Sequence, residues 1–152
     1  MDMAGKYLSV YLHMVWSTKN RRNLIDLEWR DRLHAYMGSI ARSKNAGLIE
    51  INSQPDHIHS YIAFPSTLSI AELVNALKAN STRWIRQTFP HRRFFAWQEG
   101  YAAFSVSRSE ENAVVSYIRN QDEHHKRQDF RAELLDLLES HAVEYDLRYV
   151  FD

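Results

Sequence analysis

Apolar side chains recur at every second position along residues 7–19, which is the period of a β-strand. One face of this stretch is entirely apolar and comprises Leu8, Val10, Leu12, Met14 and Trp16. Over residues 27–44 the apolar spacing changes to three and four, which predicts a helix, with Gly47 just beyond its end. Residues 48–54 and 57–64 then read as two short strands that form a hairpin.

A long helix is predicted to begin after Ser69, because Ser69 and Glu72 form a capping-box pattern. The apolar face of this helix continues to Phe89 and Pro90. Residues 101–107 then alternate again and predict a fourth strand.

The C-terminal part predicts two further helices. Ser107 and Glu110 form a second capping-box pattern, which places a helix over residues 109–125. A last helix over residues 130–140 carries Leu134, Leu135 and Leu138.

The predicted order, β-α-β-β-α-β followed by two helices, indicates an α+β fold of the ferredoxin-like (RRM-like) type. In such a fold an antiparallel sheet carries helices packed on one face. Here a helix bearing Tyr117 and one further helix would follow at the C-terminus. A length of 152 residues indicates one domain, residues 1–152. This fold hosts RNA binders, metal carriers and enzymes, so it does not define the function.

Composition narrows the class of protein and of metal site. No apolar run approaches the roughly 18 residues that span a bilayer, so no membrane partner is expected. The N-terminus lacks the pattern of a signal peptide, which predicts a cytoplasmic protein. Because there are no cysteines, disulfides and thiolate metal sites are excluded. The 19 basic and 19 acidic residues balance, which argues against a uniformly basic nucleic-acid coat but leaves local basic patches.

The motif "PDHIHSY" places His57 and His59 one residue apart on a predicted strand. Side chains at positions i and i+2 share one face of a strand, about 6–7 Å apart, so both imidazoles can bind one divalent ion. Two ligands are too few for a site, and two neighbouring histidines among eight also arise by chance. The motif therefore requires a third ligand elsewhere in the chain.

The predicted helix 109–125 offers a candidate for this third ligand. Tyr117 and Gln121 lie four residues apart and hence on the same side of a helix. Gln121 can donate an amide oxygen to a cation, and Tyr117 beside that cation can act as a nucleophile. Alternatively, Tyr117 is a half-buried aromatic and Gln121 an ordinary surface residue. Taken together with the histidine pair, the residues suit metal-assisted attack on a phosphodiester.

Five blocks in order resemble the single-tyrosine HUH transposases of bacterial insertion sequences, the IS200-like family, which are related to the REP-associated tyrosine transposases. HUH stands for His-hydrophobic-His, which "HIH" at 57–59 matches. The blocks are "HMVWSTKNRR", "PDHIHSYIAF", "LKANSTRWI", "WQEGYAAFSVS" and "YIRNQ".

The resemblance implies that His57, His59 and Gln121 bind Mg²⁺ or Mn²⁺ and that Tyr117 is the catalytic nucleophile. It implies cleavage and rejoining of single-stranded DNA, recognised as a hairpin at insertion-sequence ends, through a 5′-phosphotyrosine intermediate. It also implies a homodimer in which the tyrosine helix can complete the partner's site. Gln121 favours the insertion-sequence branch over the REP-associated branch.

Candidate DNA contacts are basic residues in three local clusters, with one serine and one aromatic platform: Lys19, Arg21, Arg22, Lys78, Ser81, Arg83, Arg92, Arg93 and Trp97. His124 and His125 end the tyrosine helix, where solvation is the default interpretation and an approach to the metal is the other. No role is assigned to the acidic segment after residue 129. Two alternatives remain open: a catalytically inactive or domesticated nucleic-acid-binding module, and a metal-dependent hydrolase that uses no covalent tyrosine.

Overall fold

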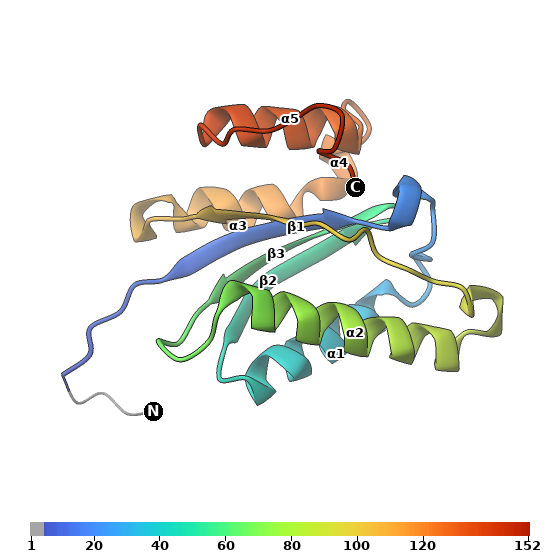
Figure 1. The fold of residues 1–152 in the computed structure, drawn as a ribbon, viewed down its shortest axis with the longest axis horizontal. Coiled ribbons are helices and arrows are strands. Elements are labelled where there is room, and N and C mark those ends of the chain that lie inside the picture. The colour runs from blue at the N-terminus through green and yellow to red at the C-terminus, as the bar shows by residue number, and fades with distance from the viewer. Residues whose placement is uncertain (1–4) are drawn as a thin grey trace.

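The computed structural model describes residues 5–152 and contains a four-stranded antiparallel sheet in the order β2-β3-β1-β4. The strands are β1 (Tyr11–Ser17), β2 (Gly47–Gln54), β3 (His57–Ala63) and β4 (Ala102–Ser105). Helices α1 (Arg30–Ser43) and α2 (Ile70–Thr88) cover one face, as Figure 1 shows. The other face carries α3 (Glu111–Arg119), α4 (Gln121–His124) and α5 (Phe130–Ser140). The predicted element order and the ferredoxin-like α+β fold are confirmed.

The face toward α1 and α2 holds the main hydrophobic core. Strand alternation directs Met14, Trp16, Ile58 and Ile62 to this side, where all four are buried. They pack against the apolar stripes of the two helices, which include Leu33, Met37, Leu73 and Leu77. Burial of these stripes is what holds α1 and α2 on the sheet.

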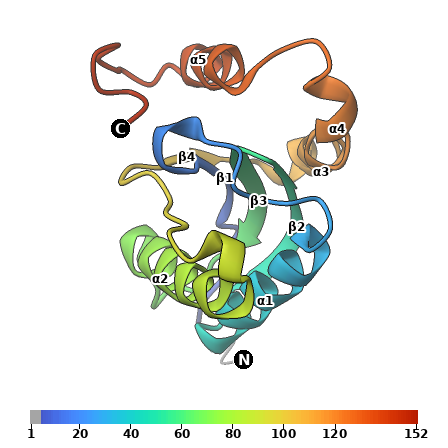
Figure 2. The ribbon, with the colours of Figure 1, turned by 90° about the vertical axis from the view of Figure 1, so that its right-hand side faces the viewer.

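The opposite face is divided between two smaller clusters. Helix α5 packs Phe130, Leu134 and Leu138 against Val15 of β1 and Phe104 of β4. Helix α3 packs over the other half of the sheet, where Ile118 contacts Tyr61 and Val106. In the view of Figure 2, α5 lies above the sheet and α3 lies apart from α5, to the right of the strands. Between the two clusters the sheet presents polar side chains instead of apolar ones.

Two element boundaries differ most from the predictions, whereas one predicted helix cap is confirmed. The first strand is shorter than 7–19, because regular pairing with β3 begins at Tyr11 and the side chains of residues 7–10 are exposed. The predicted helix 109–125 is two helices, since α3 ends before Asn120. Ser69 caps α2 by accepting a hydrogen bond from the Glu72 backbone amide, as predicted.

The capping prediction at Ser107 is wrong. A 3₁₀ turn over Arg108–Glu110 precedes α3, and the Ser107 hydroxyl bonds to the Ser109 hydroxyl instead of capping the helix. Helix α5, by contrast, is capped by Asp129, whose side chain accepts from the Ala132 amide.

Within residues 5–152, every helix is too short or too polar to cross a bilayer. The first four residues, part of the stretch that predicted no signal peptide, lie outside the described residues.

Candidate metal and tyrosine site

Strand β3 directs His57 and His59 toward the face that carries α3, α4 and α5, and both side chains are fully buried. The Nδ1 atom of each of these histidines already has a polar partner. His57 Nδ1 lies 2.6 Å from a carboxylate oxygen of Asp56, and His59 Nδ1 lies 2.8 Å from His13 Nε2. Such partners orient metal-binding histidines, and here they leave both Nε2 atoms pointing into one site.

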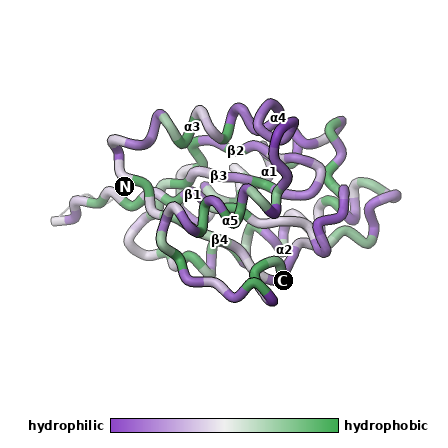
Figure 3. Tube along the Cα trace, turned by 90° about the horizontal axis from the view of Figure 1, so that it is seen from above, coloured by the Kyte–Doolittle hydropathy of each residue, from purple (hydrophilic) through white to green (hydrophobic). Residues whose placement is uncertain are grey.

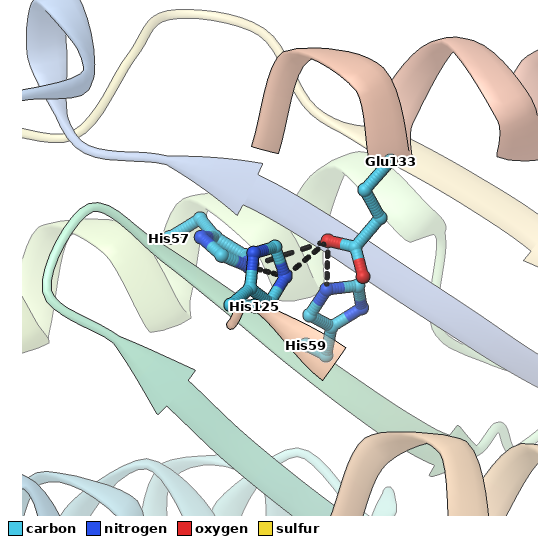
Figure 4. A group of neighbouring side chains, drawn as sticks. All are labelled: His57, His59, His125 and Glu133. Carbon is cyan, nitrogen blue, oxygen red and sulfur yellow. Dashed lines mark hydrogen bonds and ion pairs between the residues drawn. The ribbon is translucent and has the colours of Figure 1, made fainter. Parts of the chain in front are cut away.

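One carboxylate oxygen lies among these nitrogens. Glu133 Oε1, from α5, is 2.9 Å from His59 Nε2, 3.0 Å from His125 Nε2 and 3.3 Å from His57 Nε2 (Figure 4). All four ligand atoms lie within 4.8 Å of one another. Neighbouring donors around a divalent ion with bonds of about 2.1 Å lie roughly 3 Å apart. The donor set therefore fits a divalent cation in both chemistry and spacing.

Helices α3 and α4 bring Tyr117 and Gln121, respectively, to the same place. Gln121 is fully buried, with Oε1 3.3 Å from His57 Nε2 and Nε2 donating to Glu133 Oε2 at 3.0 Å. The Tyr117 hydroxyl donates a hydrogen bond to the same Glu133 oxygen, and it lies 3.4 Å from His124 Nε2. Residues more than fifty positions apart thus meet within one chain.

The charges in the site depend on each other. Burial alone would lower the pKa of His57, but hydrogen bonds to Asp56 and Glu133 outweigh it and raise the pKa to about 9. Burial lowers the pKa of His59, and burial with the nearby His59 lowers that of His13 to about 3. Burial would raise the pKa of Glu133, yet hydrogen bonds from His125, His57 and His59 keep it well below its usual range.

Tyr117 is held as a neutral phenol in this arrangement. Burial raises the pKa of its hydroxyl, and the negative charge of Glu133 raises it further. Without a further positive charge beside it, this hydroxyl is a hydrogen-bond donor and a weak nucleophile.

Polar contacts hold the tyrosine helices on the sheet. The Asn52 side chain donates to the Ile118 carbonyl at 2.9 Å, and Arg119 pairs with Glu50 at 2.8 Å. In α4, Asp122 accepts two hydrogen bonds from Arg30, at 3.1 and 2.9 Å. Figure 3 shows α4 and the turn after it as hydrophilic. Directed hydrogen bonds, with less apolar packing, therefore position the residues around Gln121.

A pocket of about 320 Å³ opens beside the tyrosine. It is lined by Tyr117, Asn120, Glu123, His124 and Arg127. Arg127 is exposed and brings a positive charge to this approach.

The candidate DNA contacts fall into two groups. Ser81 and Trp97 are buried, and the Trp97 indole donates to the Ser81 hydroxyl at 2.9 Å, so both are core groups and Trp97 offers no free face for stacking. Lys78 is half-buried and donates to three backbone carbonyls of residues 98–100.

The other candidates are more accessible. Arg92 pairs with Asp26 at 2.7 Å, and Arg21 lies 5.0 Å from the ring centre of Phe151. The remaining basic candidates are exposed: Lys19, Arg22, Arg83 and Arg93.

Sequence reasoning missed Glu133, and a signal for it was present. Phe130, Glu133, Leu134 and Leu138 share the spacing of one helix face, so an acidic residue occupies the buried stripe of α5. For His125, helix-end solvation is the default prediction and an approach to the metal the other; its Nε2 lies 3.1 Å from His57 Nε2 and 3.0 Å from Glu133 Oε1. His13 had no distinguishing pattern, since its partner lies on the neighbouring strand.

The model of the family described as "Transposase IS200 like" matches residues 6–121. The chain is 25% identical over 122 residues to the ISDra2 transposase TnpA of Deinococcus radiodurans, covering 77% of this chain and 87% of that one. It is 25% identical over 119 residues to the transposase for insertion sequence element IS200 of Salmonella typhimurium, covering 75% and 78%.

Two solved transposase structures are also similar to this chain. A Deinococcus radiodurans protein described as a transposase superposes with a TM-score of 0.64 at 27% identity, covering 80% of this chain and 98% of that one. A REP-associated tyrosine transposase bound to a REP hairpin superposes with a TM-score of 0.61 at 15% identity, covering 82% and 74%, and this likeness concerns the fold alone. With its family match, its relatives and its sheet-and-helix architecture in agreement, the chain belongs to the IS200-like transposase family.

Proposed function

We propose that this transposase cleaves and rejoins single-stranded DNA at insertion-sequence ends through a 5′-phosphotyrosine intermediate. The observation that carries the proposal is the position of the Tyr117 hydroxyl. It bonds to the same carboxylate that contacts His57 and His59, so a nucleophile and a set of metal donors share one site. The family match is consistent with this chemistry.

His57, His59 and Gln121 are the residues we expect to hold Mg²⁺ or Mn²⁺. Their Nε2 atoms and the amide oxygen converge, and the partners of the Nδ1 atoms orient the rings. When bound, such an ion polarises a non-bridging phosphate oxygen and stabilises the charge that develops in the transition state.

In the cleavage step the Tyr117 oxygen attacks phosphorus, and the bond from phosphorus to the 3′ oxygen breaks. The 5′ phosphate becomes a tyrosine ester, and the departing 3′ oxygen takes up a proton. The Tyr117 hydroxyl loses its proton in the same step, which balances the proton taken up by the 3′ oxygen, and Glu133 Oε2 accepts the hydrogen bond that holds the hydroxyl in place beforehand. Attack by a 3′-hydroxyl of another strand reverses the step, joins the DNA and frees Tyr117.

We propose a DNA hairpin as the recognised form of the substrate. The REP-associated tyrosine transposase that shares this fold is bound to a REP hairpin, and the exposed basic residues Lys19, Arg22, Arg83 and Arg93 suit contacts with phosphates. We place the reaction in the cytoplasm, within a single domain formed by residues 1–152.

A homodimer, as the resemblance implies, remains part of the proposal. Dimerisation is not needed to bring Tyr117 to the histidines, since α3 docks on its own sheet through Asn52 and Glu50. The single chain thus contains a cis arrangement of the site, and completion by the partner's helix, as the resemblance implies, is the alternative arrangement in the dimer.

The test is formation of a covalent adduct. The protein is incubated with labelled single-stranded hairpin DNA and Mn²⁺, and SDS-resistant protein–DNA species are measured. Native protein should form the adduct, Tyr117→Phe should not, and Tyr149→Phe, which alters an exposed tyrosine, should match native protein. Absence of adduct with every hairpin would favour the binding module, whereas cleavage that survives Tyr117→Phe would favour the hydrolase.

A further inference from the structure

Glu133 is an unusual residue for its position. Its side chain is 1% exposed on the apolar face of α5, whereas the other acidic residues of that helix are exposed at their positions. A buried carboxylate is costly unless it is paired and hydrogen-bonded. The Glu133 carboxylate is therefore stable at this position only because polar side chains surround it.

The surrounding sequence fixes where Glu133 points. Asp129 caps the start of α5, and the Phe130 ring stacks on the His57 ring with centroids 4.6 Å apart. Leu134 and Leu138 pack on Val15 and thereby set the rotation of the helix about its axis. With these contacts in place, residue 133 can only face the sheet.

The two carboxylate oxygens have different partners. Oε1 faces imidazole nitrogens of His57, His59 and His125 at 2.9 to 3.3 Å. Oε2 accepts hydrogen bonds from the Tyr117 hydroxyl and from the Gln121 amide. One side chain thus joins the donor cluster to the nucleophile.

We propose that Glu133 is a metal ligand through Oε1 and the positioning residue for Tyr117 through Oε2. The inference rests on the proposed function, because it adds a residue to the same site. Glu133 lies beyond residues 6–121, the segment that the family model covers. Helix α5 therefore contributes a residue to the proposed site and also covers the sheet.

This role makes metal binding depend on α5. An oxygen donor added to two imidazoles and an amide suits Mn²⁺ and Mg²⁺, which prefer carboxylate ligands. A carboxylate that also bonds the Tyr117 hydroxyl would keep the nucleophile beside a bound ion. Without Glu133, a bound ion would lack a charged ligand and the hydroxyl would lose its acceptor.

Calorimetric titration of the metal-stripped full chain with Mn²⁺ tests the proposal apart from catalysis. Glu133→Ala should weaken Mn²⁺ binding by about 10-fold or more. Glu133→Gln, which keeps the shape of the side chain, should fall between Glu133→Ala and native protein. Glu139→Gln alters an exposed acidic residue of the same helix and should bind as native protein does.

The absorption spectrum of bound Co²⁺ gives a second readout, since a change in ligand set changes its bands. Circular dichroism establishes that each variant is folded, and Glu133→Gln carries the test if Glu133→Ala does not fold. Native-like Mn²⁺ affinity and Co²⁺ spectra in the folded Glu133 variants would overturn the inference and leave the proposed function standing. Failure of native protein to bind Mn²⁺ would instead overturn the metal site itself.

Discussion

The two faces of strand β3 show two ways of holding a fold together. Ile58 and Ile62 enter the apolar core with α1 and α2, where both are buried among hydrophobic side chains and require no polar partner. His57 and His59, the neighbouring positions, enter a buried polar network in which each ring nitrogen has a partner. One strand therefore contributes to the apolar core through one face and, in the proposed function, to chemistry through the other.

The difference lies in what each face tolerates. An apolar core accepts hydrophobic side chains of similar volume at modest cost. Removing one partner from a buried polar network destabilises the folded protein, because the remaining groups stay buried and unpaired. A change that leaves a cavity on the apolar face should thus act mainly on stability, whereas loss of a partner on the polar face should act mainly on the site and its function.

Removal of a site histidine should give the largest effect. His59→Ala deletes a proposed metal ligand, so cleavage of hairpin DNA should fall by about 100-fold or more, while hairpin binding is retained. Cleavage assays with Mn²⁺ and gel-shift measurements with the same DNA separate the two effects. Native-like cleavage by this variant would remove His59 from the chemistry.

The matching change on the apolar face should act on stability instead. Ile58→Ala removes a buried side chain that is 2% exposed, and it should lower the free energy of unfolding by about 2–5 kcal/mol. Urea unfolding measures this loss, and Ile49→Ala, at a position 42% exposed, is the control expected to change little. Folded Ile58→Ala should still bind Mn²⁺; loss of binding would show that the two faces are coupled.

Acid sensitivity should give the smallest effect. Burial lowers the pKa of His34 to about 4, and its Nε2 lies 2.8 Å from the Ser53 hydroxyl, away from the proposed metal ligands. Between pH 6.5 and 4 the unfolded chain binds a proton at His34 that the folded chain does not. Stability should therefore be lost as pH falls through this window, by up to about 1.4 kcal/mol per pH unit. His34→Gln should reduce that slope in urea unfolding, and an unchanged slope would contradict the assignment.

Much of the fold was predictable because its periods are local. Alternation placed His57 and His59 on one face of a strand and Ile58 on the other, as observed. The cap at Ser69 was predictable because it depends only on residues within one helical turn. The break at Asn120 and the 3₁₀ turn before α3 were not, because docking of these helices on the sheet decides them.

The proposed site was only partly predictable. The motifs at 57–59 and 117–121 singled out side chains that the fold brings together. Glu133, His13 and the docking of α4 through Asp122 depend on pairings between elements distant in the chain. No spacing within one element encodes such pairings.

What the sequence alone determined is therefore the type of each element, the face on which each motif lies and the family resemblance. These follow from side-chain period and local hydrogen bonding, which act over a few residues. The tertiary structure decided which elements meet: it put a carboxylate of α5 between the histidines and the tyrosine, and it put Trp97 in the core. Those outcomes depend on the joint packing of the whole chain, where a buried charge is stable only beside partners contributed by other elements.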